Sequence, residues 1–293
     1  MDDNLQRIRN IQIFLAQKEF QIRDYFLSLN KDTVDSEILE IINYFKKYRF
    51  SVFPYEFPRK YYALDIDVFF DNTTGTQYVL HEDKRLYFPE DWLTDNIRLY
   101  YNSLRIEQDK DSPHRYETDG FLVQEGDVIA DVGAAEGIWA LTCAERAGKI
   151  YLFENNRQWI KALKQTFKPW EDKIIIVDKA VSNIHEGENV TFDKFFGSKR
   201  IDFIKADVEG AEIRLLEGCK DILANNKNLK LLLCAYHAKD DEKRIKKILE
   251  ESGFKTECSK GYMLFIYDLG LEKPYVRRGL VRAMKNISEI IGT

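Results

Sequence analysis

Carboxylates surround one short glycine-containing turn in this sequence. The turn runs from Asp131 to Gly137 and includes Gly133 and Glu136. It follows an apolar run and precedes a predicted helix, and such a strand, turn and helix open a nucleotide-type site because glycine lets backbone approach a ligand. Ala134 stands where a dinucleotide fingerprint has an inner glycine. Because carboxylates repel a pyrophosphate but attract a sulfonium or ammonium group, the turn favours S-adenosylmethionine over NAD.

Further cofactor contacts are predicted at the ends of the next two strands. Glu154 ends the second strand of the domain, where an acidic side chain can accept hydrogen bonds from both ribose hydroxyls. After the third strand, the Asp178 side chain or the Ala180 backbone can bind adenine, and an ordinary strand-to-loop exit is the alternative. The predicted cofactor-binding residues are Asp131, Gly133, Ala134, Glu136, Gly137, Glu154, Asn155, Asp178, Lys179, Ala180, Asp207 and Glu209.

Asp207 and His237 follow two later predicted strands. In an open α/β sheet, ligands bind outside the carboxyl ends of the strands, so both side chains are expected near a methyl donor. Methyl transfer to oxygen requires an aligned acceptor and removal of its proton. A neutral histidine suits that removal, so we predict His237 as the base, with Asp207 as the alternative base or as a partner of acceptor or cofactor. A histidine that only caps the strand is the competing interpretation.

The polar residues around Asp207 each have two possible roles. Glu209 either neutralises the sulfonium or simply favours a helix start, and Lys205 is expected to pair with a carboxylate. Asp207, Glu209 and His237 offer ligands for Mg²⁺ or Mn²⁺, but no spacing singles out a metal, so none is predicted. The predicted acceptor-binding residues are His114, Tyr116, Glu209 and His237, although a structural turn is the alternative for His114.

Strands and helices alternate from Phe121 onward, and the strands are nearly continuous apolar runs. This pattern predicts an α/β domain with a mostly parallel sheet covered by helices on both faces. Two short runs near the end suggest a closing hairpin. The predicted strands are 127–131, 150–154, 174–177, 201–206 and 229–236, the helices are 137–147, 157–167, 209–224 and 240–252, and the hairpin is 254–257 with 262–267.

The first 111 residues are predicted to form a helical and hairpin extension, which packs on the domain, forms a homodimer or covers the acceptor. Apolar stripes predict helices, with Ser36 as one N-cap. The domain is assigned to 112–270 and a basic tail to 271–293. The predicted elements of the extension are helices at 5–29, 36–47 and 91–106, a strand-like run at 61–70, and a hairpin of 76–81 with 84–88.

Composition narrows the class of protein. The 293 residues carry a formal charge of -5 with a pI of about 5.6, which argues against a nucleic-acid binder. Four cysteines without a C-x-x-C pair predict buried, reduced thiols. Because no signal peptide and no membrane-length apolar run is recognised, a soluble cytoplasmic protein is expected.

Several motifs together resemble the FkbM family of methyltransferases. The run Asp207-Val208-Glu209-Gly210-Ala211-Glu212 is the most specific, and it is accompanied by the 131–137 turn, Glu154 and Ala180-Val181-Ser182. Tyr236-His237, followed by two aspartates at 240–241, also resembles the family. The resemblance covers roughly residues 112–267.

The resemblance implies a class I, Rossmann-like methyltransferase fold with a seven-stranded sheet whose last strand is antiparallel. It implies S-adenosylmethionine as donor, with Gly133, Glu154 and Ala180 lining it and Asp207 facing the methyl group. We therefore expect an O-methyltransferase acting on a hydroxyl of a sugar, glycan or glycosylated metabolite. A macrolide-type natural product is the alternative acceptor, and a nicotinamide-dependent oxidoreductase or a non-catalytic cofactor-binding module are the alternatives from other classes.

Overall fold

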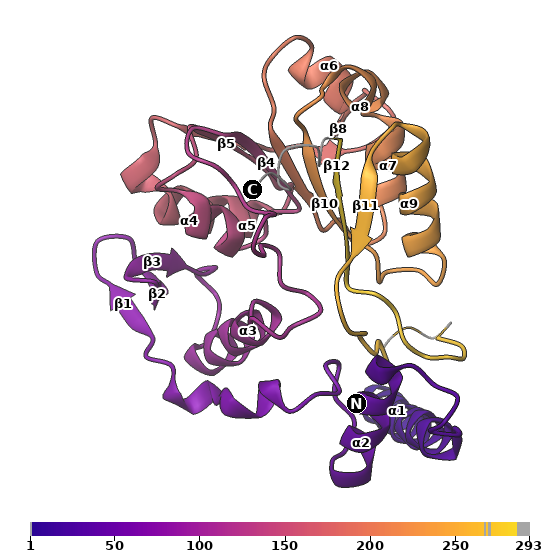
Figure 1. Ribbon diagram of the computed structural model, residues 1–293. Coiled ribbons are helices and arrows are strands. Elements are labelled where there is room, and N and C mark those ends of the chain that lie inside the picture. The colour runs from indigo at the N-terminus through magenta and orange to yellow at the C-terminus, as the bar shows by residue number, and fades with distance from the viewer. Residues whose placement is uncertain (1, 267, 269–270, 286–293) are drawn as a thin grey trace.

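A seven-stranded sheet organises the molecule (Figure 1). The computed structural model describes residues 2–266, 268 and 271–285, and only the backbone of 2–5, 7 and 8. The strand order is β11-β12-β10-β9-β4-β5-β6, and β12 is antiparallel to both of its neighbours. This is the mostly parallel, Rossmann-like sheet of a class I methyltransferase, as predicted. The strands are β4 (Val128–Val132), β5 (Lys149–Phe153), β6 (Ile174–Val177), β9 (Phe203–Ala206), β10 (Lys230–Cys234), β11 (Lys255–Cys258) and β12 (Leu280–Met284).

Helices cover both faces of the sheet because successive strand residues point to opposite sides. In β5, Ile150 and Leu152 pack into one core, while Tyr151 and Phe153 pack into the other. The first core contains side chains of α3 (Thr94–Glu107), α4 (Ile138–Cys143) and α5 (Arg157–Thr166). The second contains side chains of α6 (Phe192–Phe196), α7 (Glu212–Glu217), α8 (Lys220–Asn225) and α9 (Asp241–Glu251).

Two sequence-based predictions in this domain need correction. The single helix predicted for 209–224 is two helices, α7 and α8, which are separated at Gly218. A Cβ on Gly218 would lie 2.1 Å from the Ser182 carbonyl oxygen, so this break is where the helices approach the β7 (Ala180–Val181) and β8 (Asn189–Val190) pair.

The closing hairpin predicted for 254–257 and 262–267 is wrong. Strand β11 pairs instead with β12, which lies in the segment predicted to be a basic tail. Arg282 is buried in β12, and its guanidinium donates hydrogen bonds to the carbonyls of Arg115 and Tyr116. The charge of this arginine made the strand resemble a solvated tail, whereas its polar end is satisfied by backbone. Residues 267, 269–270 and 286–293 lie outside the described part of the chain.

The extension contains a helical pair and a small sheet. Helices α1 (Asp2–Ser28) and α2 (Ser36–Lys47) pack with Leu264, Ile266, Leu271 and Tyr275 in a third core. The N-cap of α2 is Asp35 rather than Ser36, because the Asp35 carboxylate accepts the Ile38 N–H at 2.8 Å.

The small sheet consists of β1 (Phe69–Asp71), β2 (Thr76–His81) and β3 (Lys84–Tyr87). Glu82 and Asp83 both have positive φ in the two-residue turn, as a hairpin turn requires. The hairpin is confirmed, but most of the strand predicted for 61–70 is wrong. That segment contains the 3₁₀ turn η2 (Ala63–Asp65), which follows η1 (Phe57–Lys60).

All four cysteines are free thiols; three are buried and Cys258 is half-buried. Within the described residues, no helix has the length and hydropathy needed to cross a membrane.

Candidate active site

The glycine turn after β4 interlocks with the loop after β9. Gly133 has φ +70°, and a Cβ there would lie 2.0 Å from the Asp207 carbonyl oxygen. The Asp207 N–H in turn donates to the Val132 carbonyl at 3.0 Å. Only glycine permits this approach without a backbone shift. The turn therefore fixes the position of the Asp207 backbone, from which its carboxylate extends.

Glu154 holds the other side of the same turn. Its carboxylate accepts the N–H of Ala135 at 2.9 Å and the N–H of Asn156 at 2.7 Å. Each oxygen accepts one backbone hydrogen bond, which leaves acceptor capacity for a ribose hydroxyl. The neighbouring Asn155 is exposed. Glu154 therefore has a structural task in the turn as well as the predicted position at a strand end.

The segment predicted to meet adenine is partly committed to other contacts. The Ala180 N–H donates to the Glu188 carbonyl at 2.9 Å, and Lys179 Nζ donates to the Gly187 carbonyl at 2.8 Å. Asp178 is exposed, and its side chain makes no hydrogen bond or ion pair with the described residues. Of the two adenine partners predicted here, the Asp178 carboxylate is the one that stays available as an acceptor.

Asp131 and Lys205 form a buried ion pair at 2.8 Å behind the turn. Lys205 also donates to the Gly133 carbonyl at 3.1 Å. Burial lowers the pKa of Lys205, but the negative charges of Asp131 and Asp207 outweigh it and raise the pKa overall, so the lysine is cationic. The predicted pairing of Lys205 with a carboxylate is confirmed. Asp131 was expected on an acidic rim, but it is 1% exposed and neutralised by this lysine.

Two further carboxylates lie near Asp207, one in the turn itself and one on α3. Glu136 is buried and accepts a hydrogen bond from the Tyr100 hydroxyl at 2.8 Å. Glu107, in the last turn of α3, was not predicted as a site residue. Burial, together with the charges of Asp207 and Glu136, raises its pKa to about 8. Glu107 lies seven residues after Tyr100 on the same helix. The α-helical period, which places both side chains on one face, is the one sequence signal that could have linked them.

Asp207 is the carboxylate on which most of these groups converge. The Tyr236 hydroxyl donates to its Oδ1 at 3.0 Å, and the Tyr116 hydroxyl donates to Oδ2 at 3.4 Å. Burial raises the pKa of Asp207, but the charges of Lys205, His114 and His237 outweigh it and lower the pKa overall. Asp207 is therefore an ionised group at neutral pH.

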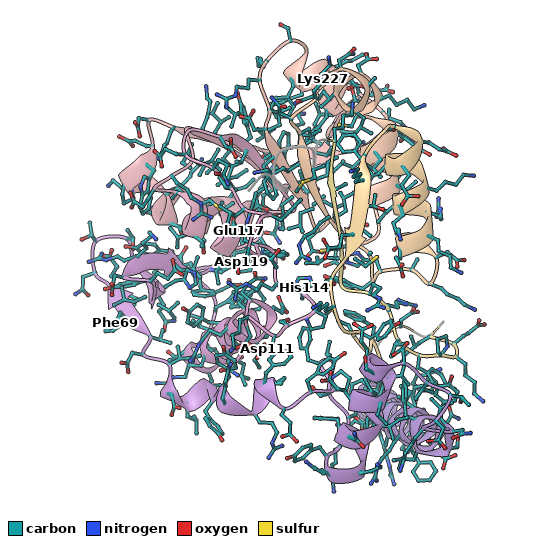
Figure 2. All side chains as sticks on the ribbon, in the orientation of Figure 1. Phe69, Asp111, His114, Glu117, Asp119 and Lys227 are labelled. Carbon is teal, nitrogen blue, oxygen red and sulfur yellow. The ribbon has the colours of Figure 1, made fainter. Side chains whose placement is uncertain are left out.

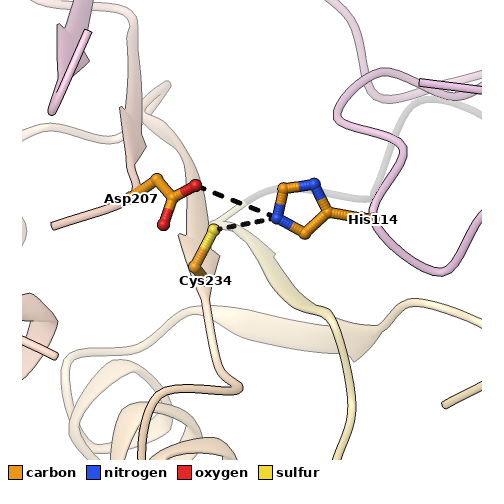
Figure 3. A group of neighbouring side chains, drawn as sticks. All are labelled: His114, Asp207 and Cys234. Carbon is orange, nitrogen blue, oxygen red and sulfur yellow. Dashed lines mark hydrogen bonds and ion pairs between the residues drawn. The ribbon is translucent and has the colours of Figure 1, made fainter. Parts of the chain in front are cut away.

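His114 lies where the extension meets the sheet (Figure 2), and its ring approaches Asp207 and Cys234 (Figure 3). Nε2 is 3.9 Å from Asp207 Oδ2 and 3.6 Å from Cys234 Sγ. Nδ1 has no hydrogen-bond partner and lies 3.8 Å from Glu107 Oε2. Burial lowers the pKa of His114 to about 4, so the ring is neutral at pH 7. At 2% exposure, this histidine is a wall of the site rather than an open acceptor contact.

His237 approaches Asp207 from the end of β10. Its Nε2 is 3.5 Å from Asp207 Oδ1, and its Nδ1 is 3.2 Å from Glu212 Oε1. Burial lowers the pKa of His237, but Glu212 outweighs it and raises the pKa overall. The Tyr236 ring packs on the imidazole with centroids 4.2 Å apart. Arg277 donates hydrogen bonds to the carbonyls of Tyr236 and His237, which fixes the backbone at this strand end.

Glu212 is a second residue for which no role was predicted. It is 1% exposed, and its Oε1 accepts the Val208 N–H at 3.0 Å. Its Oε2 has no hydrogen-bond partner among the described residues. The His237 Nδ1 contact is an ion-pair approach whose alignment falls short of a hydrogen bond. Glu209 differs sharply, because its side chain is 96% exposed and reaches within 3.8 Å of His237 Nε2.

Two groups of three side chains bring possible metal-ligand atoms within 4.8 Å of one another. They are His114, Asp207 and Cys234, and Asp207, Glu212 and His237. The approaches in each group also occur in ordinary contacts between a histidine and its neighbouring acid or thiol. We assign no metal to these side chains.

A cavity of about 340 Å³ lies outside this cluster, between α3, the β2–β3 turn and α4. Arg115 and Glu117 line it, whereas Tyr116 between them bonds Asp207. His81, expected in a surface turn, also lines the cavity, and its ring nitrogens contact the hydroxyls of Tyr101 and Thr142 at 3.0 and 3.1 Å. The cavity and the Asp207 cluster are therefore separate sites.

Comparison with known proteins gives one family and several distant structures. Residues 177–256 match the methyltransferase FkbM domain. No curated protein sequence matches the chain. An FkbM methyltransferase from Methylobacillus flagellatus KT is 15% identical, with a TM-score of 0.44 over 65% of this chain and 53% of that one. A putative transferase from Pyrococcus horikoshii is 13% identical, with a TM-score of 0.43 over 73% of each chain.

The chain thus spans about half the length of the first of these proteins. At such identities, the fold assignment depends on the strand order of the sheet rather than on these structures. The family match runs from the last residue of β6 through α9 and includes Asp207, Glu212 and His237. Residues 177–256 therefore match the FkbM methyltransferase domain, in agreement with the resemblance of the sequence motifs.

Proposed function

We propose that the protein is an S-adenosylmethionine-dependent O-methyltransferase that acts on a hydroxyl of a sugar, glycan or glycosylated metabolite. One observation supports the donor above all. Glu107, Glu136 and Asp207 are gathered around the glycine turn, while the one buried lysine there, Lys205, already pairs with Asp131. Such an excess of carboxylates suits a cationic ligand and disfavours a pyrophosphate.

The residues present fit this donor. In this proposal Asp207 and Glu136 face its charged end, Glu154 accepts from the ribose, and Asp178 accepts from the adenine. When bound, the donor supplies a methyl group on a positively charged sulfur. Gly133 then lets the backbone of the turn approach the donor, and Ala134 and Gly137 are the other turn residues proposed to line it.

The acceptor hydroxyl must lose a proton as its oxygen attacks the methyl carbon. His237 is the base in this proposal, because it borders the Asp207 cluster and because Glu212, against the effect of burial, raises its pKa above the ordinary value of a histidine. Glu212 lies 3.2 Å from Nδ1 and Asp207 lies 3.5 Å from Nε2, and we assign Nε2 as the nitrogen that takes the proton because it faces the Asp207 cluster. Asp207 is held by Tyr116 and Tyr236 and orients the reacting groups.

The acceptor class comes from the FkbM resemblance, and a macrolide-type natural product is the second acceptor class. We propose that the extension covers the acceptor, since Tyr100 of α3 bonds Glu136. A cytoplasmic location and self-association through α1 and α2 remain predictions. The apolar side chains exposed on α1, which include Phe14 and Phe20, support self-association.

Titration calorimetry of the full chain with S-adenosylhomocysteine and with NADH tests the donor assignment. We expect saturable binding of S-adenosylhomocysteine and none of NADH. Binding of NADH alone would favour a nicotinamide-dependent oxidoreductase. Tight binding of the adenosyl ligand without methyl turnover on any hydroxyl acceptor would favour a binding module.

A further inference from the structure

Helix α3 belongs to the extension, yet it delivers a carboxylate into the site around Asp207. We propose that Glu107 is a donor-binding residue and that it distinguishes the sulfonium donor from its neutral thioether product. This inference rests on the proposed function. Glu107 lies outside residues 177–256, which the family match covers, and its proposed role is to distinguish a charged ligand from a neutral one. It predicts that the extension takes part in donor binding, not only in covering the acceptor.

The geometry places Glu107 at one end of a row of three groups. Glu107 Oε2 lies 3.8 Å from His114 Nδ1, and His114 Nε2 lies 3.9 Å from Asp207 Oδ2. The imidazole between the two carboxylates is nine-tenths buried or more, and its Nδ1 has no hydrogen-bond partner. A neutral ring in this position cannot compensate either negative charge.

The elements around Glu107 contribute more carboxylates than cations to this space. Among the described residues, the one cation that acts on Glu107 is Lys205, and Asp131 already pairs with that lysine. The titratable groups that face this space are Tyr100 and Glu107 from α3, His114 and Tyr116 from the preceding segment, Asp131 and Glu136 from the β4 turn, Lys205 and Asp207 from β9, and Cys234, Tyr236 and His237 from the end of β10.

An empty site relieves this repulsion by keeping a proton on Glu107, whose pKa is raised to about 8. A bound sulfonium supplies a positive charge, so the proton is released and the carboxylate becomes an ionic partner. A bound thioether supplies no such charge, so the proton stays. The site should therefore hold the substrate more tightly than the product, which favours product release after each methyl transfer.

The test compares S-adenosylmethionine with S-adenosylhomocysteine by titration calorimetry at pH 7, in two buffers with different ionisation enthalpies. Wild-type protein should release a proton on binding the sulfonium and almost none on binding the thioether. Glu107→Gln should abolish this release and weaken sulfonium binding about tenfold, while thioether affinity changes less than about threefold. Glu125→Gln, at an exposed carboxylate remote from the site, is the matched control and should behave as wild type.

Equal weakening of both ligands by Glu107→Gln would overturn the proposal, because a merely structural role moves both. Unchanged binding of both ligands, or equal proton release on binding either one to the wild type, would also overturn it. A wild-type protein that binds neither ligand would overturn the proposed function itself. If the variant fails to fold, which its thermal melt would reveal, proton release by the wild type still decides the question.

Discussion

Two histidines approach Asp207 from different elements, and their surroundings give them opposite properties. His114 Nε2 lies 3.9 Å from Asp207 Oδ2, and His237 Nε2 lies 3.5 Å from Oδ1. Burial lowers the pKa of His114 to about 4, whereas Glu212 raises the pKa of His237. His237 is therefore the histidine suited to accept a proton at neutral pH, and His114 is a neutral wall of the site.

Removing the His237 imidazole should impair chemistry more than donor binding. We expect His237→Ala to lower kcat by about 100-fold or more, the usual contribution of a general base. The affinity for S-adenosylhomocysteine should change little, because the ring is proposed to act on the acceptor. Steady-state kinetics and calorimetry measure the two effects separately. Wild-type turnover in this variant would transfer the role of base to Asp207.

Glu212 should set the pH range in which His237 works. A base is active when deprotonated, so wild-type kcat should rise with pH through the raised pKa of His237. Glu212→Gln removes the main cause of that raised pKa, so the rise in kcat should move to lower pH, with a lower plateau. The pH profile of kcat measures this shift. An unmoved profile would show that Glu212 has only a structural role.

Among individual site residues, the sequence predicted those that lie in motifs or at strand ends, namely Asp207, Glu154 and His237. It could not predict Glu107, because that depends on how α3 packs against the sheet. It also placed Asp131 on an open rim, although Lys205 neutralises it inside the protein. Which carboxylates pair internally and which stay free is a property of packing, and spacing along the chain does not report it.

Among the elements, the loops after β4 and β9 are coupled by one glycine. Gly133→Ala should destabilise the protein more than Gly126→Ala does, because both have positive φ but only the first Cβ meets an atom, the Asp207 carbonyl at 2.0 Å. The conformation alone costs about 1–2 kcal/mol, and we expect at least about 1 kcal/mol more at Gly133. Urea denaturation of the two variants measures the difference, and equal costs would contradict this coupling.

Strand prediction succeeded where the physical signal was strong. The apolar runs at β4, β5 and β10 are buried on both faces and could be recognised from the sequence. Strand β12 could not, because Arg282 interrupts its apolar pattern and its partner β11 is distant along the chain. Long-range antiparallel pairing leaves no local signal comparable to a hairpin turn such as Glu82-Asp83.

At the scale of the whole molecule, the extension and the domain build the site jointly. The α3 residues Tyr100 and Glu107 face the glycine turn, and the segment that links α3 to β4 supplies His114 and Tyr116. The sequence predicted two separate units, with the extension as an accessory. Because the shared site brings together groups from both units, the extension is expected to be needed for donor binding as well as for acceptor selection.

A crystal structure of the full chain grown with saturating S-adenosylmethionine tests the central claim most directly. It should show the sulfonium among Asp207, Glu136 and Glu107, with the ribose hydroxyls at Glu154. A donor bound elsewhere, or a phosphate-bearing dinucleotide in this space, would contradict the claim that these carboxylates hold a positively charged methyl donor.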